Sequence, residues 1–337
     1  MSDISIREIQ EKQAQEWDEF VAHSPQGSIF TDFAWKKIID TGSFFTRRIF
    51  GVFEKDRIQA GVVLTEKRQL GKPVALSSLL TPYPGFLVSE TGTTKTSDRT
   101  SREHRFLGAL CDFLEKKYTQ IDLNNSPLLT DMRPFIQKGW KPAPRYTCHL
   151  RLEDIDALWK NFDGSVRRAV KKTGRSDLKK AVMNCTPDEV YSLLDRTLTR
   201  HGGRNPIPLS LVKSVMTNPA IAEQRVFLGA RNENKDLVSV IVSVWDDHRA
   251  YYLIAATNPD YLKTGINSGL VWELCRHLSL KGIPILDFMG ANIPGIAKFK
   301  ETFNPEIVQY YRLYKWPSPL FRIMKKTGQF LLRRRTS

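Results

Sequence analysis

The chain has 337 residues, of which 41% are hydrophobic and 10% aromatic, and its 51 Lys and Arg against 36 Asp and Glu give a formal net charge of +15. Since a single hydrophobic core usually forms from about 100–200 residues, two domains are expected, and the composition excludes a disordered basic tail. The excess of positive charge predicts an anionic partner: a nucleic acid, a phosphorylated substrate or a membrane surface.

Three classes of protein are not expected. Residues 1–10 mix charges of both signs without an apolar core, so no signal peptide is predicted. The longest stretch free of charged side chains, Pro73–Ser89, contains three prolines and falls short of the ~20 apolar residues that a membrane-spanning helix needs. The four cysteines form no C-x-x-C pair and have no His at ligand spacing, which predicts reduced thiols, no metal site and a cytoplasmic protein.

The first half of the chain is predicted to contain both helices and strands. One helix carries Trp17, Phe20 and Val21 on a single face, and a second helix follows Thr31 and contains Trp35. The next elements are strands over Thr46–Glu54 and Arg57–Lys67, a buried strand over Ser77–Val88 that Pro-Tyr-Pro-Gly interrupts, a surface loop over Glu90–Glu103, a helix over Phe106–Lys117 and a strand over Ile121–Leu123.

The second half begins with a strong helix signal at Thr186, where a capping residue, a proline at the first helical position and Glu189 form a capping box. Gly202 is expected to end this helix. The next elements are strands over Arg225–Arg231, Leu237–Trp245 and Arg249–Ala256, a helix over Ser268–Leu280 and a strand over Ile285–Phe288.

The two halves share one order of elements: a hairpin, a strand, a helix and a short strand that contains Asp. The helix with Cys111 corresponds to the helix with Cys275, and Asp122 corresponds to Asp287, at nearly the same offset. We therefore predict a mixed α/β (α+β) fold with a mixed sheet, present in two copies. The expected parts are a domain over residues 1–145, a second over residues 146–316 and a basic amphipathic tail over residues 317–337.

This order of elements is also that of the GNAT acyltransferase fold, and further motifs extend the likeness. They are Trp17–Val21 with Ser28–Phe30 and Trp35, Thr81–Gly85, Gly139-Trp140 with Tyr146-Thr147, Ser165–Lys172, Tyr252-Leu253, Leu286–Gly290 and Lys298–Phe303. In this order they resemble the tandem-GNAT family, that is, the Fem-type peptidoglycan-bridge aminoacyltransferases and their FemAB-like relatives, from about residue 15 to about residue 315. The resemblance implies that both domains are GNAT-like.

The resemblance implies an acyltransferase that moves an acyl or aminoacyl group to an amine. In this family the lysine of the Phe-Lys-x-x-Phe motif lies at the acyl-donor end, which assigns charge stabilisation to Lys300. The carbonyl is held by main chain at a splayed strand pair, which points to the strand that contains Tyr252. Asp287 ends a strand, where its carboxylate is a candidate general base or, like Asp122, a structural residue. No Ser-His-Asp or Cys-His arrangement is found, so a covalent intermediate is not expected.

A glycine-bearing basic loop favours a CoA thioester as the acyl donor. This loop lies before a predicted helix, and a helix N-terminus favours phosphate. The spacing differs from that of the common acyl-CoA loop, so an ordinary loop is the alternative. The expected donor-binding residues are Lys263, Gly265, Asn267, Ser268, Lys298 and Phe299.

A basic segment favours aminoacyl-tRNA instead. Residues Lys160–Lys180 carry a net charge of +6, which suits the phosphates of tRNA or of another polyanion. The expected contacts are Arg167, Arg168, Lys171 and Lys172. No bound cofactor is predicted, and acyl-CoA and aminoacyl-tRNA stay open as alternative co-substrates.

The resemblance implies that the acceptor binds in the groove between the two halves. It would be a cell-envelope precursor of peptidoglycan synthesis or another phosphorylated sugar conjugate, which arginine can bind through paired hydrogen bonds to phosphate. The expected residues are Lys36, Lys37, Tyr83, Arg200, His201 and Arg204. The alternatives are surface roles for the cations, a rigid turn at Tyr83 and a helix-capping role for His201.

The tail over residues 317–337 adds six basic residues and no acid, interleaved with apolar side chains such as Leu320 and Phe321. This pattern suits a helix on a membrane surface or a disordered tail. The location expected is cytoplasmic, peripheral at the inner face of the membrane if the tail binds lipid, with no obligate protein partner. The rival function is a non-catalytic GNAT-like module that binds RNA or anionic membrane through the same basic segments.

Overall fold

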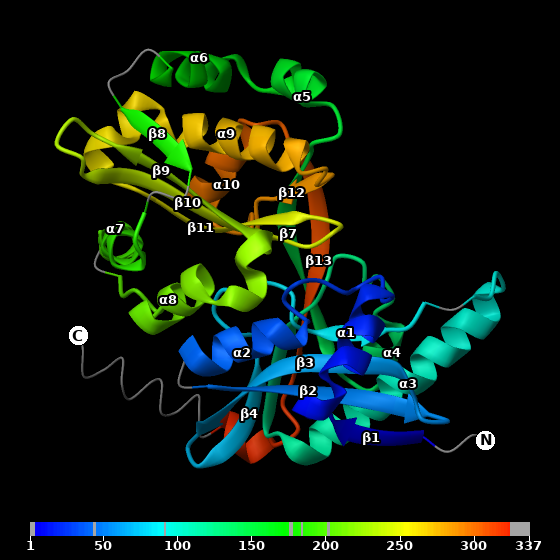
Figure 1. Ribbon diagram of the computed structural model, residues 1–337. Coiled ribbons are helices and arrows are strands. Elements are labelled where there is room, and N and C mark those ends of the chain that lie inside the picture. The colour runs from blue at the N-terminus through cyan, green and yellow to red at the C-terminus, as the bar shows by residue number, and fades with distance from the viewer. Residues whose placement is uncertain are drawn as a thin grey trace. The chain divides into compact units, whose positions relative to one another are not determined.

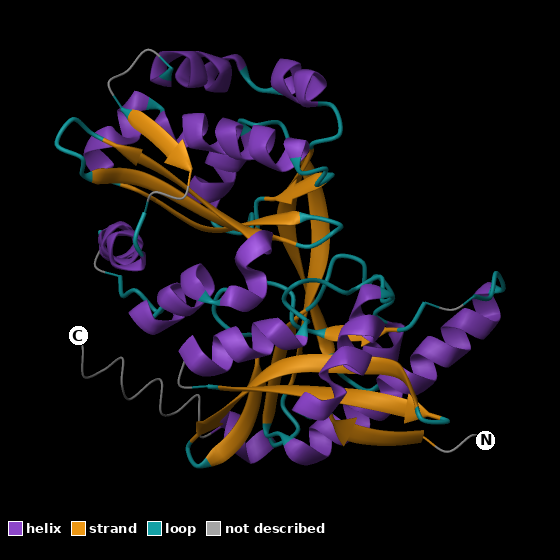
Figure 2. Ribbon diagram, viewed as in Figure 1, coloured by secondary structure: helices purple, strands orange, loops and turns teal. Residues whose placement is uncertain are grey.

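The computed structural model describes residues 4–42, 45–90, 92–174, 178–182, 185–200 and 203–323. The chain contains both helices and strands, and its strands form parallel and antiparallel pairs, which confirms the predicted mixed α/β fold (Figure 2). The chain forms two compact units: unit 1 comprises the described parts of Met1–Lys36, Phe44–Pro144 and Tyr310–Ser337, and unit 2 those of Lys37–Ser43 and Arg145–Gln309. Strands β7 (Lys141–Arg151) and β13 (Glu306–Lys315) carry the chain from one unit to the other.

Unit 1 is built on a mixed sheet with strand order β1-β2-β3-β4-β6-β13, and β5 pairs with β3. Strands β1, β2 and β3 lie side by side in it (Figure 1). Its strands are β1 (Ile4–Glu8), β2 (Thr46–Glu54), β3 (Arg57–Gln69), β4 (Lys72–Leu76), β5 (Phe86–Val88), β6 (Gln120–Asn124) and the end of β13. Its helices are α1 (Ala14–Ala22), the start of α2 (Phe33–Gly42), α3 (Thr96–Lys117) and α4 (Arg133–Gln137). The apolar face of α3 packs into the core that this sheet forms.

Unit 2 has the strand order β7-β12-β11-β10-β9-β8, in which β12 runs parallel to β11 and the other neighbours are antiparallel. Its further strands are β8 (Lys179–Val182), β9 (Arg225–Arg231), β10 (Leu237–Trp245), β11 (Ala250–Thr257) and β12 (Ile285–Asp287). Its helices include α5 (Ile155–Asn161), α6 (Gly164–Thr173), α7 (Pro187–Thr199), α8 (Leu209–Thr217), α9 (Ile266–Leu280) and α10 (Pro294–Glu301). The buried face of α9 packs on β9 and β10, and α6 packs on α9 (Figure 1).

Two predicted elements of unit 1 are wrong. The expected loop over Glu90–Glu103 contains the first turns of α3, which begins at Thr96. These turns are exposed and polar, so they carry no hydrophobic periodicity that could have revealed a helix. The expected strand over Ser77–Val88 is a strand only over Phe86–Val88, since the prolines before it have no amide hydrogen for a sheet.

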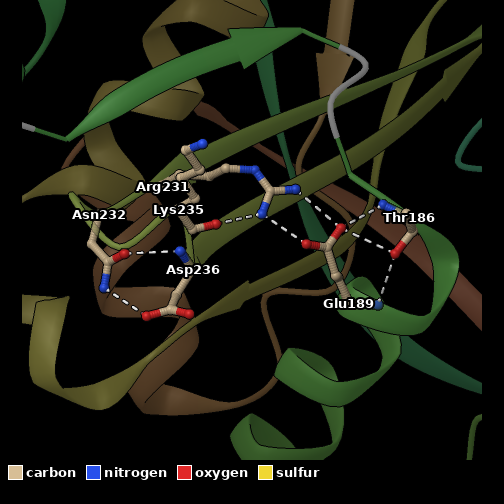
Figure 3. Close-up of polar contacts among 6 residues, drawn as sticks. All are labelled: Thr186, Glu189, Arg231, Asn232, Lys235 and Asp236. Carbon is tan, nitrogen blue, oxygen red and sulfur yellow. Dashed lines mark hydrogen bonds and ion pairs between the residues drawn. The ribbon is translucent and has the colours of Figure 1, made fainter.

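A pair of side chains fixes the start of α7 on β9 (Figure 3). The predicted capping box is confirmed: the amide of Glu189 donates to Thr186 Oγ1 at 3.3 Å, and the amide of Thr186 donates to the Glu189 carboxylate at 2.8 Å. Arg231 of β9 donates through both terminal nitrogens to the two carboxylate oxygens of Glu189, at 2.7 and 3.0 Å. This contact matters because the far end of α7 contributes to the candidate active site.

Candidate active site

Strands β11 and β12 separate soon after they meet. They are paired only at Ala250–Leu286 and Tyr251–Asp287. Beyond this point β11 continues along β10 with a bulge at Leu253, because Ile254 pairs with Val242 and Tyr252 with Ser243. A bulge bends its strand and increases the local twist. The chain after β12 turns the other way, toward β7, where the amide of Phe288 donates to the carbonyl of Cys148 at 2.8 Å.

A cavity of about 680 Å³ opens where the two strands part. One wall is β11 from Tyr252 to Thr257, and another is the turn after β12, residues 288–290. The start of α9, the helix α10 and the end of α7 complete the lining. All of these elements belong to unit 2. The splayed strand pair that the resemblance implied is therefore present in this unit.

Asp287 does not line this cavity, although the next residue, Phe288, does. Its side chain is fully buried and accepts hydrogen bonds from Thr147 Oγ1 at 2.5 Å and from the amide of Met289 at 2.6 Å, and it lies 3.3 Å from Nε2 of His149. Burial alone would raise the pKa of Asp287, but the contacts with His149, Thr147 and Met289 outweigh it and lower the pKa. This placement supports the structural alternative over the general base.

Lys300 lines the cavity and is buried, with only 6% of its surface exposed. Its ammonium donates to the carbonyl of Met289 and, at 2.8 Å, to that of Gly290. Burial lowers the pKa of Lys300, an effect that the negative charge of Asp287 partly offsets. Met289 and Gly290 both have positive φ, at 56° and 35°, so the lysine stabilises a tight turn whose residues line the cavity.

Tyr252 links β11 to the first turn of α9. Its hydroxyl donates to Oδ1 of Asn267 at 3.1 Å, and its ring meets that of Phe288 edge-on at 5.4 Å. Burial raises the pKa of Tyr252, so the phenol is protonated at neutral pH. Tyr252, Asn267 and Phe288 all line the cavity.

The expected donor-binding residues divide into two groups. Gly265, Asn267, Ser268 and Phe299 line the cavity, whereas Lys263 and Lys298 are exposed and are not part of its lining. Residue 265 must be a glycine for two reasons. Its φ is +78°, which other residues rarely adopt, and a Cβ there would lie 2.7 Å from Cβ of Ala169 in α6. The first turn of α9 thus packs directly against α6.

This packing brings together the two basic features that the sequence presented as separate. The ammonium of Lys172 in α6 lies 3.5 Å from the carbonyl of Lys263, in the glycine-bearing loop before α9. Arg168, Lys171 and Lys172 are exposed, and Arg167 is half-buried because it donates to the carbonyl of Lys160 at 2.8 Å. The amides at the start of α9 and the cations of α6 can therefore act on the same anion.

The expected acceptor-binding residues fall in both units. Arg200, after the last turn of α7, is exposed and lines the cavity. Arg204 and Lys37 are exposed, and Lys36 is half-buried with its ammonium 5.8 Å from the ring of Phe33. Tyr83 of unit 1 is buried and packs edge-on against Tyr310 at 5.2 Å. His201 lies outside the described residues.

Several cavity residues were not predicted from the sequence. They are Thr197, Leu253, Ala255, Ala256, Thr257, Pro259, Leu262, Phe288, Met289, Gly290, Gly295 and Ile296. Most are apolar residues within strands or helices, where the same pattern is expected of an ordinary core. Thr147 belonged to a motif of the resemblance, but its contact with Asp287 and that of His149 were not predicted, because Asp287 is more than a hundred residues away in the chain.

The corresponding position in unit 1 is closed. Strands β4 and β6 pair in parallel from Val74–Gln120 to Leu76–Asp122. Ser77 extends the pairing, since its amide donates to the carbonyl of Asp122 at 3.0 Å and its hydroxyl accepts from the amide of Asn124 at 2.8 Å. The chain then returns, and the amide of Gly85 donates to the carbonyl of Asn124 at 3.1 Å. Main chain thus occupies the gap that is open in unit 2.

Among the described residues, no helix combines the length and the hydropathy that crossing a membrane would require. Of the predicted tail, the described part reaches Ile323, and residues 324–337 lie outside the described residues. In this part Leu320 and Ile323 are exposed, whereas Phe321 is buried and its ring centroid lies 6.2 Å from that of Trp316.

Comparison with known proteins supports this reading of the fold. Residues 160–301 match the family described as an acetyltransferase (GNAT) domain. The crystal structure of FemX is similar over 95% of this chain and 99% of its own, at 14% identity and a TM-score of 0.69. The C-terminal domain (DUF2156) of a putative lysylphosphatidylglycerol synthetase from Agrobacterium fabrum is similar over 95% of this chain and 96% of its own, at 12% identity and a TM-score of 0.58.

A tandem GNAT protein from the clavulanic acid biosynthesis pathway is similar over 94% of this chain and 99% of its own, at 11% identity and a TM-score of 0.56. A comparison with curated proteins found no match. Likeness at these identities establishes the fold. The predicted resemblance to tandem GNAT proteins is therefore confirmed at that level, together with a GNAT domain in the second half of the chain.

Proposed function

With a GNAT acetyltransferase domain over residues 160–301, we propose that the protein is an N-acyltransferase that uses the cavity of unit 2 to transfer an acyl group from a CoA thioester to an amine. The observation that carries this proposal is the separation of β11 and β12 beyond Tyr251 and Asp287. It leaves an extended cavity with an anion-attracting helix N-terminus at one end and a strand bulge along its wall.

In the proposed reaction, the nitrogen of a neutral amine attacks the thioester carbonyl carbon. The C–N bond forms, the C–S bond breaks, and the proton that the amine loses ends on the leaving thiolate, which gives an amide and a free thiol. Main chain of β11 near the bulge at Leu253 would hold the carbonyl, and Lys300 would supply positive charge near the developing oxyanion. The hydroxyl of Tyr252 donates to Asn267 Oδ1 in this structure, and it would exchange that partner to donate a hydrogen bond to the thiolate.

The phosphates of the donor would lie at the start of α9, next to the cations of α6. The positive end of the helix dipole favours an anion there, although the first amide of α9, that of Ile266, already donates to Thr264 Oγ1 at 3.2 Å. Arg168, Lys171 and Lys172 add exposed positive charge to the adjoining helix. This basic face also supports a second candidate donor, aminoacyl-tRNA, whose phosphates it would contact.

The acceptor would approach from the end of α7, where Arg200 lines the cavity and Arg204 follows. Two arginines suit a phosphorylated acceptor such as a cell-envelope precursor. A cytoplasmic reaction, with the basic tail at the inner face of the membrane, forms part of the same proposal.

Titration of the full chain with acetyl-CoA and with aminoacyl-tRNA, each at several salt concentrations, tests the proposal. We expect saturable binding of acetyl-CoA that Gly265→Ala weakens by about tenfold or more, because the new Cβ both strains a positive φ and pushes α6 away. Gly282→Ala is the matched control, since Gly282 has φ +74° but nothing within 4 Å of a Cβ.

Other outcomes would decide against this function. Binding of aminoacyl-tRNA without binding of acetyl-CoA would replace the donor. If neither donor binds while RNA or anionic vesicles bind with strong salt dependence, the protein is the non-catalytic module instead.

A further inference from the structure

The walls of the unit 2 cavity are more apolar than an acetyl group requires. Beside Tyr252 and the phenyl rings of Phe288 and Phe299, the lining contains Leu253, Ala255, Ala256, Leu262, Met289 and Ile296. Leu262 is 49% exposed and Ile296 46% exposed, and neighbouring Ile293 is 61% exposed. Aliphatic side chains that stay in water around an open cavity mark a surface that an apolar ligand covers.

The charges of the lining point the same way. Its charged side chains are Arg200 and Lys300, both cationic, and no described residue of the lining is an Asp, a Glu or a His. An aminoacyl group carries an α-amino group, which is largely protonated near neutral pH and is then positively charged. Two cations line the cavity, whereas Asp287 lies outside the lining and is already bound by Thr147 and Met289, so that charge would be disfavoured. An uncharged acyl group has no such cost.

Two glycines leave room in the cavity wall. A Cβ added at Gly290 or at Gly295 would meet no atom within 4 Å, and both residues line the cavity. Gly295 lies in the first turn of α10, next to Ile296 and one turn before Phe299. Both glycines are exposed, so this space is open to solvent, and two apolar lining residues, Ile296 and Phe299, lie on the same helix as Gly295.

We infer that the acyl group of the donor is an uncharged aliphatic chain several carbons long, and that it lies in this space beside α10. The inference rests on the proposed function, because it assigns the chain of the thioester that the cavity would bind. Each methylene transferred from water to an apolar site contributes about 0.8 kcal/mol, which corresponds to about a fourfold gain in affinity. Affinity should therefore rise with chain length until the space is full.

The experiment is a calorimetric titration of the full chain with acetyl-, hexanoyl- and decanoyl-CoA, each kept below its micelle-forming concentration. From acetyl to hexanoyl, we expect the Kd to fall with each added methylene by a factor of up to about four. If acetyl-CoA binds as tightly as the longer esters, the inference is wrong and the proposed N-acyltransferase is unaffected. If no CoA ester binds, the proposed function itself fails.

A variant that fills the space beside Gly295 tests whether the acyl chain lies there. Gly295→Leu should abolish the gain from acetyl to decanoyl while it changes the Kd of acetyl-CoA by less than about threefold. Gly92→Leu is the matched control, because Gly92 is also exposed with nothing within 4 Å of a Cβ, but lies in unit 1. An equal loss for all three esters, or no change in the chain-length gain, would overturn the placement beside Gly295.

Discussion

The ammonium of Lys300 binds two successive carbonyls in a turn of positive φ, at the wall of the cavity. The Phe-Lys-x-x-Phe motif identified this lysine as a candidate, but its partners, the carbonyls of Met289 and Gly290, lie about ten residues earlier in the chain. A buried cation at this point can do two things. It can hold the turn of Met289 and Gly290, and its charge can stabilise an oxyanion that forms beside it.

Replacement of Lys300 by Met distinguishes the two roles. We expect the rate of amide formation to fall by about a hundredfold or more, with little change in the Kd of the donor, because the charge acts on the transition state. Rapid-mixing kinetics and titration measure the two quantities. Lys281→Met, an exposed lysine at the end of α9, is the control. A weaker Kd with an unchanged rate for the bound donor would show that Lys300 only positions the turn.

At the scale of single elements, the link between α7 and β9 has the clearest electrostatic signature (Figure 3). Hydrogen bonds from Arg231 to Glu189, with further bonds from Thr186, lower the pKa of that carboxyl from 4.5 to about 2. The pKa in the folded state is thus lower than in the unfolded chain. The stability that this pair contributes is therefore fully present above about pH 4.5 and is lost as the pH falls through about 2.

Glu189→Gln should lower the free energy of unfolding near neutral pH, and the difference from the wild type should shrink as the pH falls from about 4.5 to about 2. Urea unfolding at a series of pH values measures this difference. Asp188→Asn is the control one residue away, since its ion pair with Lys213 is exposed, at 63% for the aspartate, and exposed pairs contribute little. A difference for Glu189→Gln that stays constant over this range would contradict the assigned contact.

The junction of α6 and α9 shows how elements determine what a motif can do. Gly265 and Gly269 allow α9 to approach Ala169 and Thr173 of α6, where a Cβ would come within 2.7 and 2.5 Å. The sequence offered a glycine-bearing loop and a basic segment as signals for different donors. Because the two helices pack together, both features belong to one surface of unit 2.

At the scale of the molecule, the two units share an order of elements but differ at the corresponding strand ends. In unit 2, β11 and β12 part after two residue pairs. In unit 1, Ser77 continues the pairing of β4 with β6, and Gly85 binds the next carbonyl of β6. A duplicated fold therefore provides one open cavity of this kind among the described residues.

We accordingly expect one acyl-CoA to bind per chain. Calorimetric titration should give a stoichiometry near one, and Gly265→Ala in unit 2 should weaken this binding by about tenfold or more. Two equivalent sites per chain would contradict the closure of unit 1. Substitution of Ser77 by Ala serves as the complementary test, because loss of a single hydroxyl contact at 2.8 Å leaves the main-chain closure by Gly85 and should not create a second site.

Much of the fold could be predicted from hydrophobic periodicity and turn residues. Strands β2, β9 and β10 have the bounds expected, and α7 begins at its capping box. The start of α3 was missed because its first turns are polar on all sides, and local pattern carries no signal for such a helix. The strand expected over Ser77–Val88 was wrong because Ser77 continues the pairing of β4 with β6 and the prolines that follow have no amide hydrogen for a sheet.

The sequence by itself determined the mixed α/β class, the duplicated order of elements and the resemblance to tandem GNAT proteins, because these depend on local periodicity and on the order of motifs. The resemblance pointed to the strand of Tyr252, but only the tertiary structure decided where its pairing with β12 ends, which apolar residues line a cavity rather than a core, and which basic residues face a common site. These properties depend on hydrogen bonds and packing between residues far apart in the chain, such as Asp287 with Thr147 and Gly265 with Ala169. Local sequence carries no record of such contacts.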